Sequence, residues 1–293
     1  MKKKVLVLGS TGLIGHQVYN FLKDNSDFHL SNIAYRTKLQ KDTILLDARD
    51  EENFISYIER INPNYIVNCI GVLISQAKKD PESAIFLNTY LPHRLSRLAD
   101  ELNAKLIHMS TDCVFSGNKK TPYVELDEKD GQDTYAKTKS AGEVINNKHL
   151  TLRTSVVGPE LKPNGEELFN WFMNQTGSIS GFTKAMWSGV TTMEIAKAVK
   201  WSIDNEITGL YHVTNNHPIN KNDLLQLFKK YTQKEINITP IEGQDVDKSF
   251  IDTRKLIDYE IPPYDHMISD MVKLIKNNSF LYLHYGIGDS VEK

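Results

Sequence analysis

Short apolar runs alternate with amphipathic stretches along the first half of the chain. Such runs, bounded by polar residues or glycine, predict strands that are buried on both faces of a sheet. They lie at residues 5–8, 30–35, 44–46, 65–71, 106–109 and 150–157. Apolar residues at helical spacing between them predict helices that include residues 51–61, 81–102 and 133–147. Pro92 should kink or split the second of these helices, because proline lacks the N–H that a helix interior needs.

Strands that alternate with helices predict a parallel sheet with helices on both faces. We therefore expect an α/β protein with a Rossmann-type doubly wound sheet. The alternation is less regular after residue 157. Further helices are expected at 166–175, 192–203, 221–233 and 265–276, further strands at 209–213 and 236–240, and a glycine- and serine-rich loop at 177–189. These elements predict a smaller C-terminal α/β lobe that covers the carboxyl ends of the strands.

The expected division places a nucleotide-binding domain at residues 1–157, to which residues 190–215 return. A substrate-binding lobe would comprise residues 158–189 and 216–293. The tail 277–293 contains a short apolar stretch that begins at Phe280 and then becomes polar. A mobile terminus and a contact between the subunits of a homodimer both fit this tail.

The composition narrows the class of protein. The chain has 293 residues and a net charge of −2, so electrostatics favour neither nucleic acid nor an anionic membrane as a partner. No apolar run approaches the roughly 18 residues of a membrane span, and the run after Lys4 is too short for a signal peptide. With two cysteines, Cys69 and Cys113, and no cluster at metal-ligand spacing, we expect a reduced cytoplasmic protein without a bound metal.

A glycine-rich turn, residues 9–15, stands between the first predicted strand and the first helix. In the sequence Gly-Ser-Thr-Gly-Leu-Ile-Gly, the first glycine permits the tight turn and the second lets a pyrophosphate approach the backbone. The third permits close helix–strand packing, and the helix N-terminus adds N–H donors. This context favours dinucleotide binding over a plain strand-to-helix turn. The expected cofactor contacts in this segment are Gly9, Thr11, Gly12, Leu13 and Ile14.

The end of the second strand predicts which nicotinamide cofactor is bound. NAD-binding proteins usually place Asp or Glu there, to bond the ribose 2′-hydroxyl. This chain has Arg36, Thr37 and Lys38 instead, and a guanidinium suits the 2′-phosphate of NADP. We therefore expect NADPH. In the alternative, NADH is the cofactor and Arg36 is an ordinary surface charge.

Further cofactor contacts are expected where the third and fourth strands end, because ligands of such sheets lie beyond the carboxyl ends of the strands. The expected residues are Asp47, Ala48, Cys69, Ile70 and Gly71. Asp47 would contact the adenine amine or cap the helix that starts near Glu51. Asn88, inside the helix 81–102, would either bond a backbone group or orient a water near the site.

A hydroxyl, a phenol and an amine converge on the end of the fifth strand. Thr111 ends this strand, and Tyr135 and Lys139 stand one helical turn apart in the following helix. An ammonium beside a tyrosine favours the phenolate and lowers the tyrosine pKa, and the threonine hydroxyl could bond the same carbonyl oxygen. The three residues therefore predict acid–base chemistry on a carbonyl group. The alternative is a pair of ordinary side chains on a solvated helix face.

Residues 9–15, 110–117 and 135–143, with Arg153-Thr-Ser155, together resemble the extended short-chain dehydrogenase/reductase superfamily, most closely the dTDP-4-dehydrorhamnose reductases. The resemblance implies NAD(P)H-dependent reduction of the 4-keto group of a nucleotide-linked 6-deoxy sugar. It implies that Tyr135 protonates the new hydroxyl, that Lys139 holds the nicotinamide ribose and that Thr111 polarises the ketone. It also places Asp112, Cys113 and Val114 near the substrate.

Two positions depart from the pattern of that family. Cys113 stands where a tyrosine is usual, and Val156 stands where a tryptophan usually packs on the sugar. The chemistry tolerates both changes, but they leave the sugar unidentified. The variant with Cys113 resembles a branch of capsule and O-antigen enzymes whose substrates include UDP-linked N-acetylamino sugars.

The segment 177–189 is the expected substrate-binding loop of the second lobe. Lys184 would contact a phosphate, and Phe182 and Trp187 would offer flat apolar surfaces. The alternative is that both aromatic residues belong to the core of the small lobe.

A nucleotide-sugar reductase is therefore the expected function. An epimerase or dehydratase on the same fold would keep its cofactor bound, and recycling enzymes of that kind tend to hold NAD, which Arg36 disfavours. The resembled family also includes a regulatory subunit that binds NADP and a partner enzyme. The presence of Thr111, Tyr135 and Lys139 argues against a purely binding role.

Overall fold

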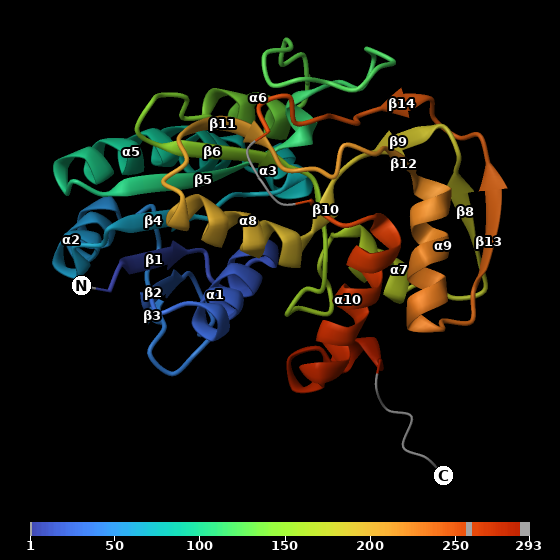
Figure 1. Cartoon of the computed structure of the whole chain (residues 1–293), viewed down its shortest axis with the longest axis horizontal. Coiled ribbons are helices and arrows are strands. Elements are labelled where there is room, and N and C mark those ends of the chain that lie inside the picture. Colours follow the sequence, from blue (N-terminus) through green and yellow to red (C-terminus); the bar gives the residue numbers. More distant parts are fainter. Residues whose placement is uncertain (1, 256–259, 288–293) are drawn as a thin grey trace.

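The structure is a computed structural model that describes residues 2–255 and 260–287. A seven-stranded sheet with the strand order β11-β6-β5-β4-β1-β2-β3 forms its centre (Figure 1). Every neighbouring pair in this sheet is parallel, as the alternation of strands and helices predicted. The strands are β1 (Lys4–Leu8), β2 (His29–Ala34), β3 (Ile44–Leu45), β4 (Tyr65–Asn68), β5 (Lys105–Thr111), β6 (Leu150–Thr154) and β11 (Gly209–His212).

Successive side chains of the central strands point to opposite faces, and each face is covered by helices. Val5 and Val7 of β1 belong to the apolar cluster that includes α1 (Leu13–Asn25) and α8 (Thr192–Asp204). Leu6 and Leu8 belong to the cluster that includes α2 (Glu51–Ile61) and α5 (Leu91–Glu101). This is the doubly wound α/β fold that the sequence predicted, because strands buried on both faces need apolar residues at nearly every position.

The helix expected at 81–102 is irregular. It comprises α4 (Pro81–Ala84), a wider π-helical turn (Ile85–Tyr90) and α5, in which Pro92 is the second residue. The backbone stays helical where these elements join, so Pro92 does not split the helix. The irregularity is instead the π turn that precedes Pro92, and such turns often accompany a bend in a helix.

The helix expected at 133–147 is shorter in the structure, where α6 spans Thr134–Ala141. Gly142 follows, and a Cβ there would lie 1.8 Å from the carbonyl oxygen of Asn88. Glu143 then leaves the helix direction and pairs with buried Arg153, with Oε2 at 2.8 Å from NH2. This buried pair, together with the close approach of the π turn, decides where α6 ends.

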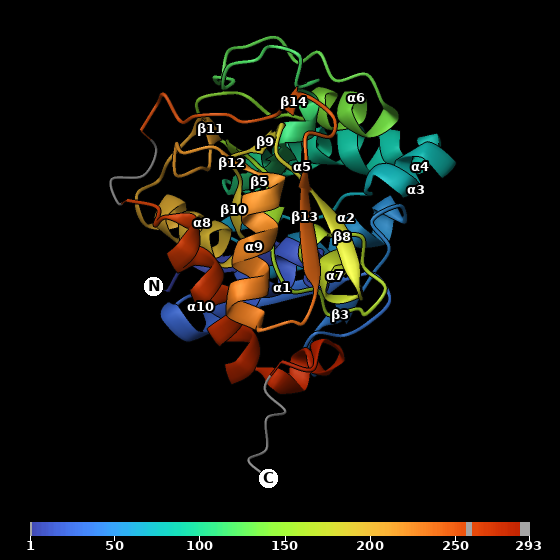
Figure 2. The ribbon, with the colours of Figure 1, turned by 90° about the vertical axis from the view of Figure 1, so that its right-hand side faces the viewer.

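The second lobe follows β7 (Val156–Val157) and lies to one side of the sheet (Figures 1 and 2). Its helices are α7 (Leu168–Met173), α9 (Lys221–Thr232) and α10 (Tyr264–Asn277). Its strands are β8 (Ser178–Phe182), β9 (Ala185–Trp187), β12 (Ile219–Asn220), β13 (Asn237–Ile241) and β14 (Val246–Asp247), whereas β10 (Val190–Thr191) pairs with β7 and leads into α8. The expected loop 177–189 is therefore wrong: β8 pairs with β13, and β9 pairs with β12 and β14.

The segment after α10 packs on its own chain as far as residue 287. Tyr282 and Tyr285 are buried there, next to short helical turns at Ser279–Leu281 and Leu283–Tyr285. The Tyr282 hydroxyl accepts a hydrogen bond of 2.6 Å from Gln17 Nε2 in α1. For residues 277–287 the expectation of a mobile terminus is wrong, and residues 288–293 lie outside the described residues. No helix in the described part of the chain is long and apolar enough to cross a membrane.

Candidate active site

The glycine-rich turn lies beyond the carboxyl end of β1 and leads directly into α1. Gly9 has φ +74°, a conformation that favours glycine, and its carbonyl accepts a 2.9 Å hydrogen bond from the Gly12 N–H. A Cβ on Gly15 would lie 2.2 Å from the Gly9 carbonyl oxygen, so only glycine permits this packing. The first N–H groups of α1 have no partners within the helix and therefore suit a phosphate.

Two adjoining cavities run along the carboxyl ends of the strands. One has a volume of about 530 Å³ and the other of about 440 Å³. They share a wall that includes Thr11, Gly12, Cys69, Ile70 and Gly71, all of which the sequence placed near a cofactor. Leu13 and Ile14 line the larger cavity, whereas Gly9, Asp47 and Ala48 line the smaller one.

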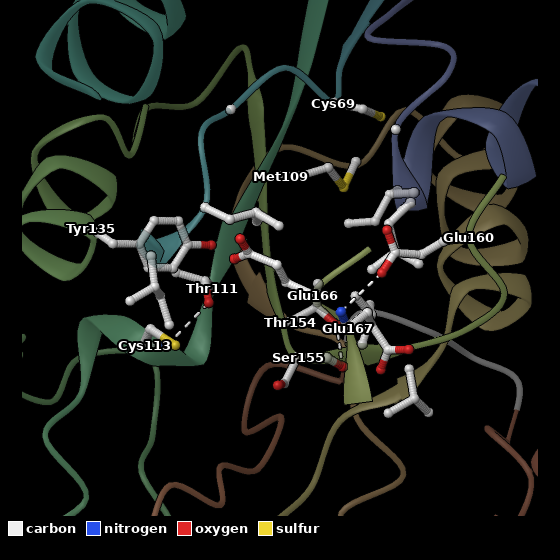
Figure 3. A pocket seen from close by; sticks show the side chains of 18 of the residues that line it. Cys69, Met109, Thr111, Cys113, Tyr135, Thr154, Ser155, Glu160, Glu166 and Glu167 are labelled. Atoms are coloured by element: carbon white, nitrogen blue, oxygen red, sulfur yellow. Dashed lines mark hydrogen bonds between the residues drawn. The ribbon is translucent and has the colours of Figure 1, made fainter. Parts of the chain in front are cut away.

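Thr111, Tyr135 and Lys139 line the larger cavity together. Figure 3 shows Thr111 and Tyr135 on the same side of it. Asp133 caps α6 by accepting a 2.8 Å hydrogen bond from Ala136 N–H, which places Tyr135 in the first turn. Lys139 follows one turn later, and its Nζ donates to the Met109 carbonyl at 2.6 Å. We call Gly12, Thr111, Tyr135 and Lys139 the near wall of this cavity.

Burial sets the protonation of the near wall. It lowers the pKa of Lys139 to about 8, while nearby Glu143 and Cys69 act in the opposite direction. It also raises the pKa of Tyr135, which a hydrogen bond with Thr111 only partly offsets. The expectation of a lowered tyrosine pKa is therefore wrong for the protein alone, because desolvation of the phenolate outweighs the other interactions. A tyrosine that keeps its proton at neutral pH suits an acid rather than a base.

Arginine and tyrosine side chains surround the smaller cavity. The Arg36 guanidinium lies 4.6 Å from the centroid of the Tyr35 ring, and both residues line the cavity. Arg49, which sequence reasoning missed, lies there too and donates to the Tyr35 hydroxyl at 2.9 Å. Asp47 neither caps α2 nor stands free: it pairs with Arg49 at 2.7 Å, and this hydrogen bond lowers the pKa of its carboxyl.

Asn88 has a structural role. Its buried amide accepts from the Val72 N–H at 3.0 Å and donates to the Val72 carbonyl at 3.1 Å. It thereby holds the chain after β4 against the π turn. Of the two roles that the sequence left open, the structure shows the bond to the backbone.

The residues expected to contact a substrate are divided by the structure. Asp112, Cys113 and Trp187 line the larger cavity. Trp187 is also buried, and its indole Nε1 donates to Ser155 Oγ at 2.7 Å. In contrast, Val114 points into a separate apolar cluster with Phe115 and Tyr123 and does not line the cavity.

Phe182 and Lys184 also lie outside the cavity lining. Phe182 ends β8, which pairs with β13 at the outer side of the second lobe (Figure 1). Lys184 follows, and it forms an exposed ion pair of 2.7 Å with Glu242. The pairing of β8 with β13 directs this segment away from the sheet, so the structure does not bring these two residues to the substrate.

A family model for the RmlD substrate binding domain matches residues 2–250. The chain belongs to this family. Among curated proteins, dTDP-4-dehydrorhamnose reductase of Shigella flexneri is 31% identical over 158 residues, which are 52% of this chain and 51% of that protein. The chain thus spans about half the length of the curated reductases that it matches.

Two further comparisons extend over more of this RmlD-family chain. Methionine adenosyltransferase 2 subunit beta of Xenopus laevis is 27% identical over 236 residues, 76% of this chain and 70% of that protein. The crystal structure of dTDP-4-dehydrorhamnose reductase from Bacillus anthracis in complex with NADP superimposes with a TM-score of 0.79 at 20% identity. It covers 94% of this chain and 100% of that one, so the two share their fold.

The opposite wall of the larger cavity was missed by sequence reasoning, except for Trp187. The further lining residues there include Ser155, Glu160, Lys162, Glu166, Glu167 and Lys221. We call Ser155, Glu160, Glu167, Trp187 and Lys221 the far wall. The residues from 155 to 167 follow β6 and β7, so the rule that ligands lie beyond carboxyl strand ends could have found them. No local signal indicated Lys221.

Proposed function

We propose that this RmlD-family protein is an NADPH-dependent reductase of the 4-keto group of a nucleotide-linked 6-deoxy sugar. The observation that carries the proposal is the near wall. Thr111, Tyr135 and Lys139 meet in a cavity that adjoins a second cavity lined by arginine. The curated relatives named dTDP-4-dehydrorhamnose reductase support the same reaction.

The residues present fit a dinucleotide. At Gly12 the turn would present backbone to a pyrophosphate, and Gly15 permits the close packing that brings the start of α1 to the turn, because a side chain there would collide with the Gly9 carbonyl. Arg36, and beside it Arg49, would hold the 2′-phosphate, and Lys139 the nicotinamide ribose. When bound, NADPH supplies the hydride that reduces the carbonyl carbon.

The chain itself would supply the proton. The Tyr135 hydroxyl would protonate the carbonyl oxygen, and the raised pKa keeps that proton in place until the oxygen becomes basic. The Thr111 hydroxyl would donate to the same oxygen. Asp112, Cys113 and Trp187 would contact the substrate from either side.

We further propose the domain division stated above, with residues 1–157 and 190–215 binding the cofactor and 158–189 with 216–293 binding the sugar nucleotide. The proposed location is the cytoplasm, supported by the free thiols of Cys69 and Cys113. A homodimer is also proposed, and light scattering tests it directly.

The test is consumption of NADPH by the purified protein with dTDP-4-dehydrorhamnose, followed by absorbance. Turnover that depends on both compounds supports the reductase. A second candidate, a non-catalytic NADP-binding subunit, is raised by the relative named methionine adenosyltransferase 2 subunit beta. NADPH binding without turnover of any 4-keto sugar nucleotide would favour that candidate. Tightly bound NAD in the purified protein would favour an epimerase or dehydratase.

A further inference from the structure

The far wall contains a buried carboxyl group with an unused oxygen. The Glu167 side chain is 9% exposed, and its Oε2 accepts a 2.8 Å hydrogen bond from the Phe169 N–H. Its Oε1 meets no donor at good hydrogen-bond geometry among the described residues, although the Gly158 N–H also faces the carboxyl group. Figure 3 shows Glu167 across the cavity from Tyr135. A buried polar atom that lines a cavity and lacks a partner is suited to bind a ligand atom.

Lys221 brings a positive charge to the same cavity. It begins α9, and its Nζ lies 5.1 Å from the centroid of the Trp187 ring. Within the described residues this ammonium forms no hydrogen bond or ion pair. Burial lowers the pKa of Lys221, and the carboxyl groups of Asp112 and Glu167, which line the same cavity, act in the opposite direction.

The protonation state of Glu167 determines which groups of a ligand can form hydrogen bonds with it. Burial raises the pKa of Glu167 to about 8, while hydrogen bonds from the Phe169 and Gly158 N–H groups and, to a smaller extent, the charge of Lys221 act in the opposite direction. Both the acid and the carboxylate are therefore populated near neutral pH. A hydroxyl group can accept from the acid or donate to the carboxylate, and it can accept from an ammonium at the same time.

The lining carries side chains of both charges, namely Glu160, Glu166 and Glu167 together with Lys139, Lys162 and Lys221. Burial raises the pKa values of Glu160 and Glu167 and so favours their neutral acid forms, which can bond an uncharged hydroxyl group. The ring of Trp187 offers an apolar surface for the carbon atoms of a neutral sugar.

We infer that Glu167 and Lys221 together bind one ring hydroxyl of the sugar and so determine its specificity. The hydroxyl would bond Glu167 Oε1 and accept from Lys221 Nζ, while the ketone meets Tyr135 and Thr111. This inference rests on the proposed reductase function, and it adds the two residues that would recognise one hydroxyl group of the sugar.

The experiment compares Glu167→Gln and Lys221→Met with the wild type, using NADPH and dTDP-4-dehydrorhamnose. Glutamine keeps an oxygen for the Phe169 N–H, and methionine keeps the apolar contact with Trp187. The matched controls are Glu242→Gln and Lys184→Met, an ion pair outside the cavity. We expect KM for the sugar nucleotide to rise about tenfold or more in both test variants. The kcat, the KM for NADPH and the controls should change by less than about threefold.

Analogues of the sugar nucleotide that each lack one ring hydroxyl sharpen the test. Loss of the bound hydroxyl should raise KM for the wild type by the same factor, with no further rise in Glu167→Gln. Binding is followed separately by isothermal titration calorimetry with NADP⁺ present, and stability by the melting temperature.

These measurements separate the two proposals. If the wild type binds the sugar nucleotide but does not reduce it, the reductase proposal is overturned. The hydroxyl inference is then decided by whether Glu167→Gln and Lys221→Met bind the sugar nucleotide more weakly than the wild type. Unchanged KM and affinity in both variants overturn the inference, as does a lowered melting temperature with unchanged affinity. If the wild type neither binds nor reduces this sugar nucleotide, both proposals are overturned for it.

Discussion

The two walls of the larger cavity are built in different ways. The near-wall residues lie at the ends of strands, in the turn after β1, or on the helix α6. Lys139 is held by the backbone carbonyl of Met109, and Asp133 caps the helix turn that carries Tyr135. The far wall is held by contacts between distant segments. Examples are the 2.9 Å bond from Glu160 N–H to the Tyr285 hydroxyl and the 2.7 Å bond from Trp187 to Ser155.

A contact of Glu166, which also lines the larger cavity, shows the same difference. Ser75 of α3 (Ile74–Lys79) donates to the Glu166 carboxylate, 91 residues away. The near wall thus presents a reactive group that local sequence specifies. The far wall presents a shape that only the folded chain specifies. Reaction type and substrate choice should therefore respond to different mutations.

The largest effect is expected at the near wall. Tyr135→Phe removes the proton donor but keeps the ring, so kcat should fall roughly a hundredfold to ten-thousandfold. NADPH affinity should barely change. Stopped assays of turnover and titration of NADPH measure both, and Tyr90→Phe, an exposed tyrosine, is the control. Turnover like that of the wild type would remove Tyr135 from the mechanism.

The next effect concerns the buried ion pair that underlies the near wall. Glu143 accepts from Arg153, Ser110 and Lys129. Glu143→Ala leaves the Arg153 charge buried without this partner, so the free energy of unfolding should fall by about 3–5 kcal/mol. Urea unfolding measures the loss. The double variant Glu143→Leu with Arg153→Met should recover much of it, and no recovery would show that the pair also specifies the local fold.

The far wall should show a distinctive pH dependence of stability. Because burial raises the pKa of Glu167 from 4.5 to about 8, the folded state binds more protons than the unfolded state between these values. The contribution of Glu167 is therefore complete below pH 4.5 and is lost as the pH rises through 8. Over this range it should change the free energy of unfolding by on the order of a few kcal/mol.

Melting temperatures at about pH 5 and at pH 8 test this expectation in the wild type and in Glu167→Gln. The glutamine variant should lose less stability over this range, while Glu242→Gln should behave as the wild type. An equal loss in Glu167→Gln would show that Glu167 is ionised in the folded protein at neutral pH.

Cofactor choice gives a smaller effect. If Arg36 pairs with the 2′-phosphate, Arg36→Ala loses a charge-assisted hydrogen bond of about 1.5–3 kcal/mol. This corresponds to a roughly tenfold or greater loss of NADPH affinity, with NADH little affected. Lys38→Ala is the neighbouring control. Equal losses for both cofactors would show that Arg36 does not recognise the phosphate, and Arg49→Ala would then be the next variant to titrate.

The smallest effect is expected at the C-terminal segment that supports both walls. Tyr282→Phe removes the hydroxyl that bonds Gln17 and lies 3.0 Å from His16 Nε2. The free energy of unfolding should fall by about 0.5–1.5 kcal/mol, since the ring remains buried. A weaker NADPH affinity in the same variant would show that this segment also positions the glycine-rich turn. Tyr285→Phe removes the hydroxyl that accepts from the Glu160 N–H, so comparing the two variants distinguishes an effect on the far wall from an effect on the glycine-rich turn.

Much of the fold and of the near wall could be predicted from the sequence. The apolar runs predicted the parallel strands, and α2 begins and ends where the sequence placed it, at Glu51 and Ile61. The glycine-rich turn, Thr111, Tyr135 and Lys139 were found because each stands at a short, fixed distance from a predicted strand or helix. Such signals are local: they depend on backbone periodicity, turn conformation and the edge of the sheet to which a strand points.

The tertiary structure alone decided the rest. The short strands β8 and β9 exist because they pair with β13, β12 and β14, segments whose partners no local pattern names. Phe182 and Lys184 therefore turn outward, while Glu167 and Lys221, 54 positions apart, meet in one cavity. The tertiary structure also decides the protonation of the site. Burial lowers the pKa of Lys139 to about 8 and raises the pKa of Glu167 to about 8. Desolvation is a property of the folded surroundings, which residue identity and spacing alone do not specify.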